Sequence, residues 1–212
     1  MSRLTAFAWV ALALAGCGGD DAAPGDASGT AGTQAGTGGQ AGTSAGGTAG
    51  VPPCLPAPEP FGIDPDLGHS FPDVQLTSCD GKKQSLEEIR CAHALTLLSI
   101  GAGWCAPCKE ETPDLQVVSD ALADQGLGVV QVMFEDTQAN PASTLFCKTW
   151  VETYSLAIPV FIDPAGNVLE PVGGVAIPVN VVLDHDGRVV WAINGVVPPD
   201  LLGTLQELLS AR

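Results

Sequence analysis

The chain has 212 residues, with 24 Asp and Glu against 8 Lys and Arg and a formal net charge of −16. This length allows one domain of ordinary size with residues to spare. Because phosphate binding depends on clustered Lys and Arg, the charge argues against nucleic acid as a partner and is typical of a soluble surface.

The first residues predict an export signal. Arg3 precedes an apolar run, residues 4–15, that is too short to span a membrane as a stable helix. The sequence LAGC that ends at Cys17 resembles the bacterial lipobox, in which the cysteine is acylated and becomes the mature N-terminus. An ordinary signal peptide with a chance cysteine is the alternative. We expect a lipoprotein signal peptide at 1–16 and attachment to a lipid bilayer through Cys17.

Residues 17–60 predict a tether between the lipid and a folded domain. Residues 18–50 contain no Val, Leu, Ile or aromatic side chain, so they cannot bury enough apolar surface to fold. The proline-rich VPPCLPAPEP at 51–60 stiffens the approach. The domain itself is expected over 61–212, which is long enough for a single core.

The domain predicts an α/β fold. A strand at 71–76 leads into a turn at Asp80-Gly81 and a brief polar helix or turn. Hydrophobic patterns then predict strands at 95–100, 129–134, 179–183 and 189–193, and helices from the Cys105 region to about 123, at 141–154 and at 199–209. This order indicates a mixed central sheet, with parallel strands joined by helices, a final antiparallel hairpin and helices on both faces.

Two cysteines lie between a buried strand and a helix, in the stretch GAGWCAPCKEETPDL at 101–115. A thiolate at a helix N-terminus is stabilised by the helix dipole and unpaired backbone N–H groups, so its pKa falls. Cys105, the more exposed of the two by position, would attack a substrate disulfide, and Cys108 would resolve the mixed disulfide. Pro107 between them restricts the backbone.

Other readings of this pair remain open at this point. A zinc site needs four ligands, and the chain has no second CxxC or HxxxH motif, although Cys91 and His93 could be recruited. A purely structural disulfide is the other alternative. The sequence therefore implies no metal and no cofactor, and redox chemistry is the favoured interpretation.

Four further cysteines suggest two structural disulfides in an exported protein. Three pairings are possible, and sequence cannot choose among them. Cys79 and Cys91 flank a short connection and are the favoured partners. Cys54 with Cys147 would then fasten the end of the tether to the domain.

The string from Trp104 to Lys109, WCAPCK, resembles the active-site motif of the thioredoxin superfamily. More narrowly it is similar to the TlpA/ResA-type redoxins, which are membrane-anchored thiol-disulfide oxidoreductases of bacterial envelopes. The resemblance covers about residues 65–212 and includes FPDVQL, DGKKQSLEEIR and VVLDHDGRVV. It implies a thioredoxin-like fold, protein thiols and disulfides as substrates, and a membrane protein that donates or accepts electrons.

The resemblance also assigns substrate-binding residues. Ile177-Pro178 matches the cis-proline loop of the family, so Pro178 should be cis and face the cysteine pair. Such a loop pairs its backbone with an extended substrate peptide, and Trp104 and Pro107 would complete the binding surface. Ile158-Pro159 is a rival position for the cis bond, but it precedes a separate strand.

Glu111 matches an acidic residue of the ResA-like branch that is implicated in proton handling, and it could approach Cys108 from one turn into the helix. A solvated first-turn glutamate is the alternative. Ser99 stands where thioredoxin has a buried aspartate, so that proton relay is absent.

Two rival functions lie outside this interpretation. One is a lipid-tethered binding or scaffold module whose disulfide never cycles. The other is a peroxiredoxin-type peroxidase, which would need a threonine where Ala102 stands and could use Cys147 as a resolving thiol. The favoured expectation is a monomeric protein-disulfide oxidoreductase, lipid-anchored at the bacterial cell envelope and facing the periplasm or exterior.

Overall fold

The computed structural model describes residues 54–173 and 176–212. The predicted signal peptide, Cys17 and the tether up to residue 53 lie outside these residues. Within the described ranges, no helix combines the length and the apolar character that crossing a bilayer requires.

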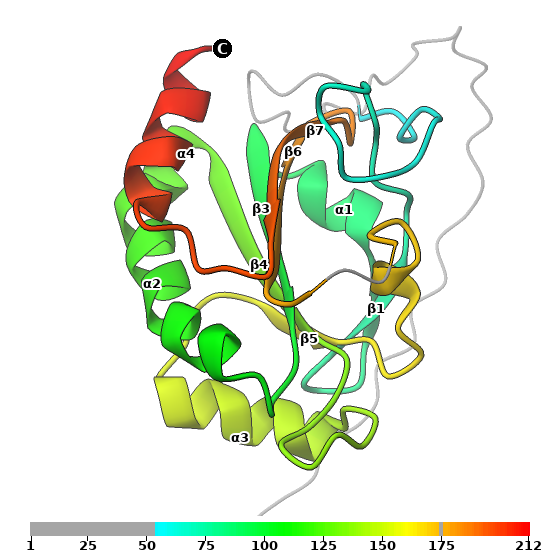
Figure 1. Cartoon of the computed structure of the whole chain (residues 1–212), viewed down its shortest axis with the longest axis vertical. Helices are drawn as coiled ribbons and strands as arrows, with labels where there is room; N and C mark the ends of the chain where they lie inside the picture. The colour runs from blue at the N-terminus through cyan, green and yellow to red at the C-terminus, as the bar shows by residue number, and fades with distance from the viewer. Residues whose placement is uncertain (1–53, 174–175) are drawn as a thin grey trace, which may run out of the picture. The chain divides into compact units, whose positions relative to one another are not determined.

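The described residues form a sheet flanked by helices (Figure 1). The strands are β1 Gln75–Ser78, β2 Lys83–Ser85, β3 Leu95–Gly101, β4 Leu127–Met133, β5 Val160–Ile162, β6 Val179–Asp184 and β7 Val189–Asn194. The helices are α1 Leu86–Arg90, α2 Ala106–Leu122, α3 Thr144–Tyr154 and α4 Leu201–Ser210, with short 3-10 turns at Ala123–Gln125 and Asn167–Leu169. The predicted mixed α/β sheet is confirmed.

The strands form one seven-stranded sheet in the order β2-β1-β5-β4-β3-β6-β7. β3, β4 and β5 run parallel, whereas β6 and β7 form the predicted antiparallel hairpin at one edge. In the centre Leu98 pairs with Val130 on β4 and with Val181 on β6. All residues of β3 are buried, as expected of a strand that is covered on both faces.

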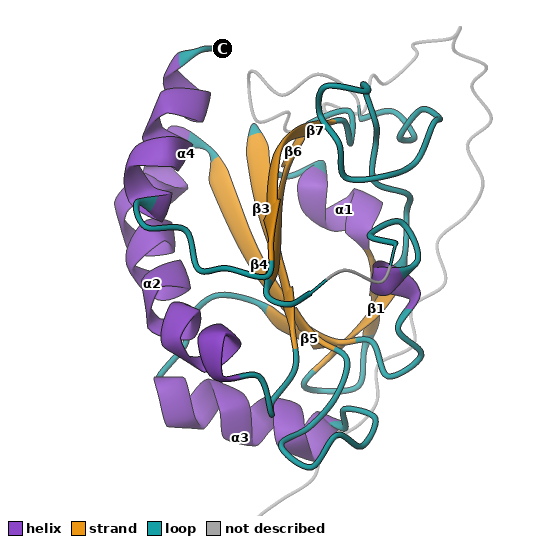
Figure 2. Cartoon of the chain, viewed as in Figure 1, coloured by secondary structure: helices purple, strands orange, loops and turns teal. Residues whose placement is uncertain are grey.

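Helices cover both faces of the sheet (Figure 2). α2, α3 and α4 pack over one face, where Leu115, Trp150 and Leu205 belong to one buried cluster. α1 covers the other face with Leu86 and Ile89, which belong to a second cluster. Burying both faces removes enough apolar surface from water to hold a sheet of this size.

Three elements differ from the sequence expectation. β1 begins at Gln75 rather than Phe71, because the backbone N–H of Phe71 donates to Gly187 O in the hairpin turn instead of to a neighbouring strand. α3 begins at Thr144 rather than 141, because the hydroxyl of Ser143 caps the helix by accepting from Phe146 N. β2 is a short strand that the sequence did not predict, whereas β5 is the separate strand expected after Ile158-Pro159.

The favoured pairing of the four additional cysteines is wrong. The structure joins Cys54 to Cys91 and Cys79 to Cys147. The reason is the sheet: Cys79 packs against the cluster beneath α2 and α3, whereas Cys91 ends α1 on the opposite face. Closeness in sequence therefore does not bring Cys79 and Cys91 together. Cys54 does fasten the end of the predicted tether to the domain, but through Cys91.

Candidate active site

The cysteine pair lies where β3 ends and α2 begins. Cys105 is the N-cap of α2, and its Sγ accepts a hydrogen bond from the backbone N–H of Cys108 at 3.2 Å. The two cysteines form a disulfide with their Cα atoms 5.3 Å apart. Cys105 is only 3% exposed and Cys108 1%, so the predicted difference in exposure is small. The pair occupies the helix N-terminus that favours a thiolate.

The predicted cis-proline loop faces the pair. The Ile177–Pro178 peptide bond is cis, whereas that of the rival Ile158–Pro159 is not among the cis bonds of the described residues. The carbonyl oxygen of Ile177 lies 3.8 Å from Cys105 Sγ. In the dithiol form the Cys105 thiol could donate a hydrogen bond to this oxygen.

Trp104 forms the rim of the site. Its side chain is 46% exposed, and its indole Nε1 donates to Glu135 Oε2 at 2.6 Å. Pro107 is also exposed. Gly103 before them is required by space, because a Cβ there would lie 2.8 Å from the backbone of Asp136 and from the Phe146 ring. The absence of a side chain at Gly103 thus lets the loop after β4 and the Phe146 ring of α3 approach the motif closely.

Glu111 is buried, which excludes a solvated first-turn glutamate. Its side chain is 0% exposed, its Oε2 accepts from Ser99 Oγ at 3.3 Å, and its Oε1 accepts from Asn180 Nδ2. Burial raises its pKa to about 7, against the lowering effect of the hydrogen bonds from Asn180 and Ser99. Ser99 on β3 stands where thioredoxin has a buried aspartate. In this protein the Glu111 carboxyl group, which comes from α2, lies buried beside that position instead.

Asn180 can serve both protonation states of that carboxyl group. Its Oδ1 is buried and has no hydrogen-bond partner among the described residues. The amide donates through Nδ2 to the carboxylate, and after a 180° turn its Oδ1 could accept from the protonated acid. A pKa near 7 with a two-way partner gives a group that can exchange protons at neutral pH.

A buried hydrogen-bond chain behind the pair was missed by the sequence reasoning. The indole of Trp150 donates to Gln131 Oε1, the amide of Gln131 donates to Thr112 Oγ1, and Thr112 donates to the backbone carbonyl of Cys108 at 2.7 Å. A glutamine within the apolar strand VVQVMF is the one sequence signal that could have revealed it. The chain fixes the first turn of α2 to β4 and α3.

A groove of about 530 Å³ opens on the α3 side of the site. Lys109 of α2 contributes one wall, and the rings of Phe146, Trp150 and Tyr154 lie along the other. These rings contact one another, with centroids 5.7 Å and 4.6 Å apart. Among the residues described, no cluster of three or more His, Cys, Asp or Glu is placed to bind a metal ion.

Comparison with known proteins identifies a family and relatives that this chain resembles. The model of the AhpC/TSA family matches residues 67–192, which is more than half of the chain. The thiol-disulfide oxidoreductase ResA of Bacillus thuringiensis subsp. konkukian is 25% identical over 130 residues, 61% of this chain and 70% of that protein. The thioredoxin-like protein YneN of Bacillus subtilis is 29% identical over 120 residues, 57% of this chain and 66% of that protein.

The fold is also that of solved redox proteins. The thioredoxin domain of a thiol-disulfide oxidoreductase from Bacteroides vulgatus aligns with a TM-score of 0.57 and 21% identity, over 67% of this chain and 96% of that chain. The family match at residues 67–192 spans β3, the cysteine pair, β6 and most of β7. The chain thus belongs to the AhpC/TSA family, as a TlpA/ResA-like redoxin with a thioredoxin-like fold, and it is a thiol-disulfide oxidoreductase.

Proposed function

We propose that this redoxin acts as a monomer at the bacterial cell envelope, where it reduces or exchanges disulfides of exported proteins. The observation that carries the proposal is the Cys105–Cys108 disulfide at the N-terminus of α2, beside the carbonyl of Ile177. The predicted export signal at 1–16 and the lipobox-like sequence that ends at Cys17 support the location.

Cys105 is the proposed nucleophile. In the dithiol form its thiolate accepts a hydrogen bond from the Cys108 N–H and lies at the positive end of the α2 dipole. Both interactions favour the charged form. It attacks one sulfur of a substrate disulfide, and the other substrate sulfur leaves as a thiolate. Cys108 then attacks Cys105 Sγ, which closes the enzyme disulfide and releases the second substrate thiol.

Glu111 is the proposed proton acceptor for Cys108. It follows Cys108 by one turn on the same helix, which places the two side chains on one face. Its pKa of about 7 means that the carboxyl group is divided between both forms at neutral pH. It can therefore take the Cys108 proton before the resolving step and give it back to Cys108 when the disulfide is next reduced to the dithiol.

The substrate is proposed to lie extended against Ile177 and Pro178, with Trp104 and Pro107 at the rim. Ile177 offers a backbone carbonyl beside the reacting sulfur, and an extended peptide that pairs with it would place its disulfide over Cys105. A membrane protein is proposed to renew the dithiol form. Ala102 is buried against the pair where a peroxidase would need a threonine, so no peroxidase function is proposed.

Insulin reduction by dithiothreitol tests the chemistry. The wild-type protein should accelerate precipitation of the insulin B chain, and Cys105→Ser and Cys108→Ser should abolish the acceleration. Glu110→Gln, an exposed change on the same helix, is the matched control and should retain wild-type activity. Equal rates for the wild type and both cysteine variants would refute turnover at this pair.

Two further measurements test direction and location. A reduction potential near the thioredoxin value of about −270 mV would support reduction of substrates, and one near about −180 mV would support exchange. Palmitate labelling in a bacterial host should mark the wild type but not Cys17→Ala, and labelling of both or of neither would refute the proposed anchor.

A further inference from the structure

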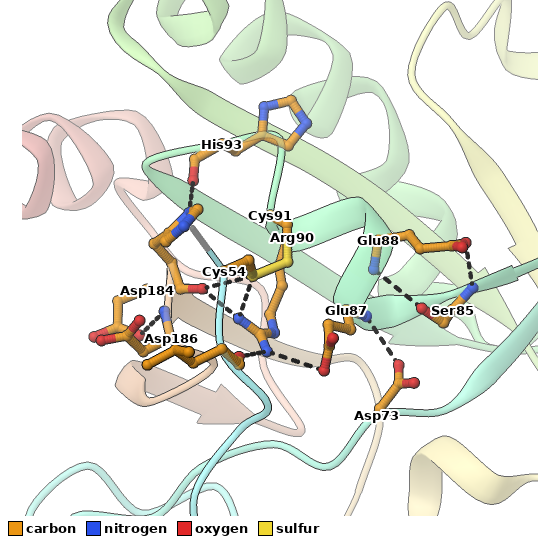
Figure 3. The surroundings of a disulfide bond; sticks show 12 residues. Cys54, Asp73, Ser85, Glu87, Glu88, Arg90, Cys91, His93, Asp184 and Asp186 are labelled. Atoms are coloured by element: carbon orange, nitrogen blue, oxygen red, sulfur yellow. Dashed lines mark hydrogen bonds and ion pairs between the residues drawn. A yellow bond between two sulfur atoms is a disulfide. The ribbon is translucent and has the colours of Figure 1, made fainter. Parts of the chain in front are cut away.

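The Cys54–Cys91 disulfide lies beside a buried cation. Figure 3 shows the guanidinium group of Arg90, the last residue of α1, next to Cys54. Its Nη1 donates toward Cys54 Sγ over 3.1 Å. The same side chain donates to the carbonyl oxygens of Leu55 and His185. One sulfur of the disulfide is thus in direct contact with an arginine side chain.

This arginine has little counter-charge. Arg90 is 2% exposed, and the carboxylate within ion-pair distance is that of Glu87 at 3.5 Å, which is itself 33% exposed and therefore partly screened by water. A buried cation is costly unless an anion compensates it. Opening the disulfide would supply that anion. Cys54 would become a thiolate that accepts a charge-assisted hydrogen bond from Arg90, whose Nη1 already lies 3.1 Å from its sulfur.

We propose that Cys54–Cys91 is a second thiol-disulfide exchange site, in which Arg90 stabilises the Cys54 thiolate as the leaving group and the co-substrate is a dithiol. Both cysteines are partly exposed, so a thiol can reach them. An adjacent guanidinium lowers the pKa of a thiol, and a thiol of lower pKa leaves faster.

The reaction balances as a two-electron exchange. One thiolate of the dithiol attacks Cys91 Sγ, the Cys54–Cys91 bond breaks, and Cys54 leaves as a thiolate paired with Arg90. The second thiolate of the dithiol then attacks the dithiol sulfur that is bonded to Cys91. Cys91 is released and takes up a proton. The dithiol ends as a disulfide, and its other proton passes to water.

This site is separate from the Cys105–Cys108 pair. Cys91 precedes β3 and Cys105 follows it, and a strand of that length spans about 20 Å. The two pairs therefore cannot exchange within one molecule in this fold, and the dithiol must belong to another molecule. The inference holds whether or not the function proposed for Cys105 is correct.

The third disulfide provides an internal comparison. Cys147 is fully buried, and within residues 54–173 and 176–212 no Lys or Arg donates a hydrogen bond to it or to Cys79. Cys79–Cys147 should therefore resist a dithiol under conditions in which Cys54–Cys91 opens. Both disulfides can be followed in the same sample.

The test is a redox titration of the purified protein in dithiothreitol buffers of graded potential, at fixed pH. Samples are alkylated, and mass spectrometry of peptides gives the reduced fraction of each cysteine pair. In the wild type Cys54–Cys91 should be reduced before Cys79–Cys147. In Arg90→Gln the equilibrium constant for reduction of Cys54–Cys91 should fall about threefold to tenfold, while that of Cys79–Cys147 stays unchanged.

Companion variants separate the charge of Arg90 from its packing. Arg90→Lys keeps the charge and should recover part of the loss. Glu87→Gln removes the competing carboxylate and should act in the opposite sense, raising the constant by about twofold. Glu88→Gln is its matched control, because the Glu88 carboxylate accepts from Ser85 N rather than from Arg90, and it should leave the constant unchanged.

An unchanged constant in a folded Arg90→Gln would overturn the proposal, as would reduction of Cys79–Cys147 first in the wild type. Should Arg90→Gln fail to fold, the Glu87→Gln and Glu88→Gln pair decides. Equal constants for those two variants then refute the role of Arg90, and a selective rise in Glu87→Gln supports it. Insulin reduction through Cys105 should be the same in all of these folded variants.

Discussion

Replacing Glu111 with glutamine should change how the stability of the protein depends on pH. The glutamine is close to isosteric and keeps hydrogen-bonding groups for Ser99 and Asn180, but it cannot ionise. In the wild type, burial raises the pKa of Glu111 from 4.5 to about 7. The variant thus removes one buried titration and leaves the remaining contacts nearly intact.

The magnitude follows from linkage. Because the folded state holds the Glu111 proton more tightly than the unfolded state does, the free energy of unfolding falls as pH rises through the window between 4.5 and about 7. Each unit of pKa difference is about 1.4 kcal/mol, so the total loss is on the order of 3 kcal/mol. Glu111→Gln cannot ionise and should not show this loss. The difference in free energy of unfolding between the variant and the wild type should therefore shift in favour of the variant by about 3 kcal/mol between pH 4 and a pH above 7.

Urea unfolding of the oxidised protein at a series of pH values measures this directly. Keeping the Cys105–Cys108 disulfide closed prevents thiol titration from contributing. Glu110→Gln removes the same charge from the exposed neighbouring position and serves as the control. The reasoning is refuted if the stability difference between wild type and Glu111→Gln does not vary with pH, or varies no more than that of Glu110→Gln.

Three other variants test the scaffold of the domain. Gln131→Leu should lower the free energy of unfolding in urea by about 2 kcal/mol, because it leaves buried polar groups on α2 and α3 without their hydrogen-bond partner. An unchanged free energy would mean that this hydrogen-bond chain does not contribute to stability. Removing Cys79 and Cys147 together as alanines opens a connection of 68 residues and should cost about 4 kcal/mol; a loss below 1 kcal/mol would contradict this. Ser85→Ala removes the capping box of α1 and should lower stability by about 1 kcal/mol, which thermal unfolding would detect as a lower Tm.

The local features of the site were predictable from the sequence because they depend on local patterns. An apolar run predicted β3, and helical spacing after the cysteines predicted α2. The resemblance then identified Ile177-Pro178 as the cis bond, which the structure confirms. Each of these features is decided by a few neighbouring residues.

The features that failed depend on which face of the sheet a residue occupies. The cysteine pairing favoured partners close in sequence, but Cys79 and Cys91 lie on opposite faces of the sheet. The short β2 carries too few residues for a periodic pattern to be decisive. The burial of Arg90 had one signal, since it follows Leu86 by four residues and so shares its inward face of α1.

The hydrogen-bond chain from Trp150 through Gln131 and Thr112 ends on the carbonyl of Cys108, and it makes the two halves of the reactive pair mechanically unequal. Opening the disulfide requires the sulfurs to move from bonding distance to van der Waals separation. The peptide of Cys108 is held from behind by three elements, whereas Cys105 stands outside the helix as its cap. When the disulfide opens, Cys105 and the short loop that carries it therefore make most of the movement. They move toward the side from which a substrate arrives.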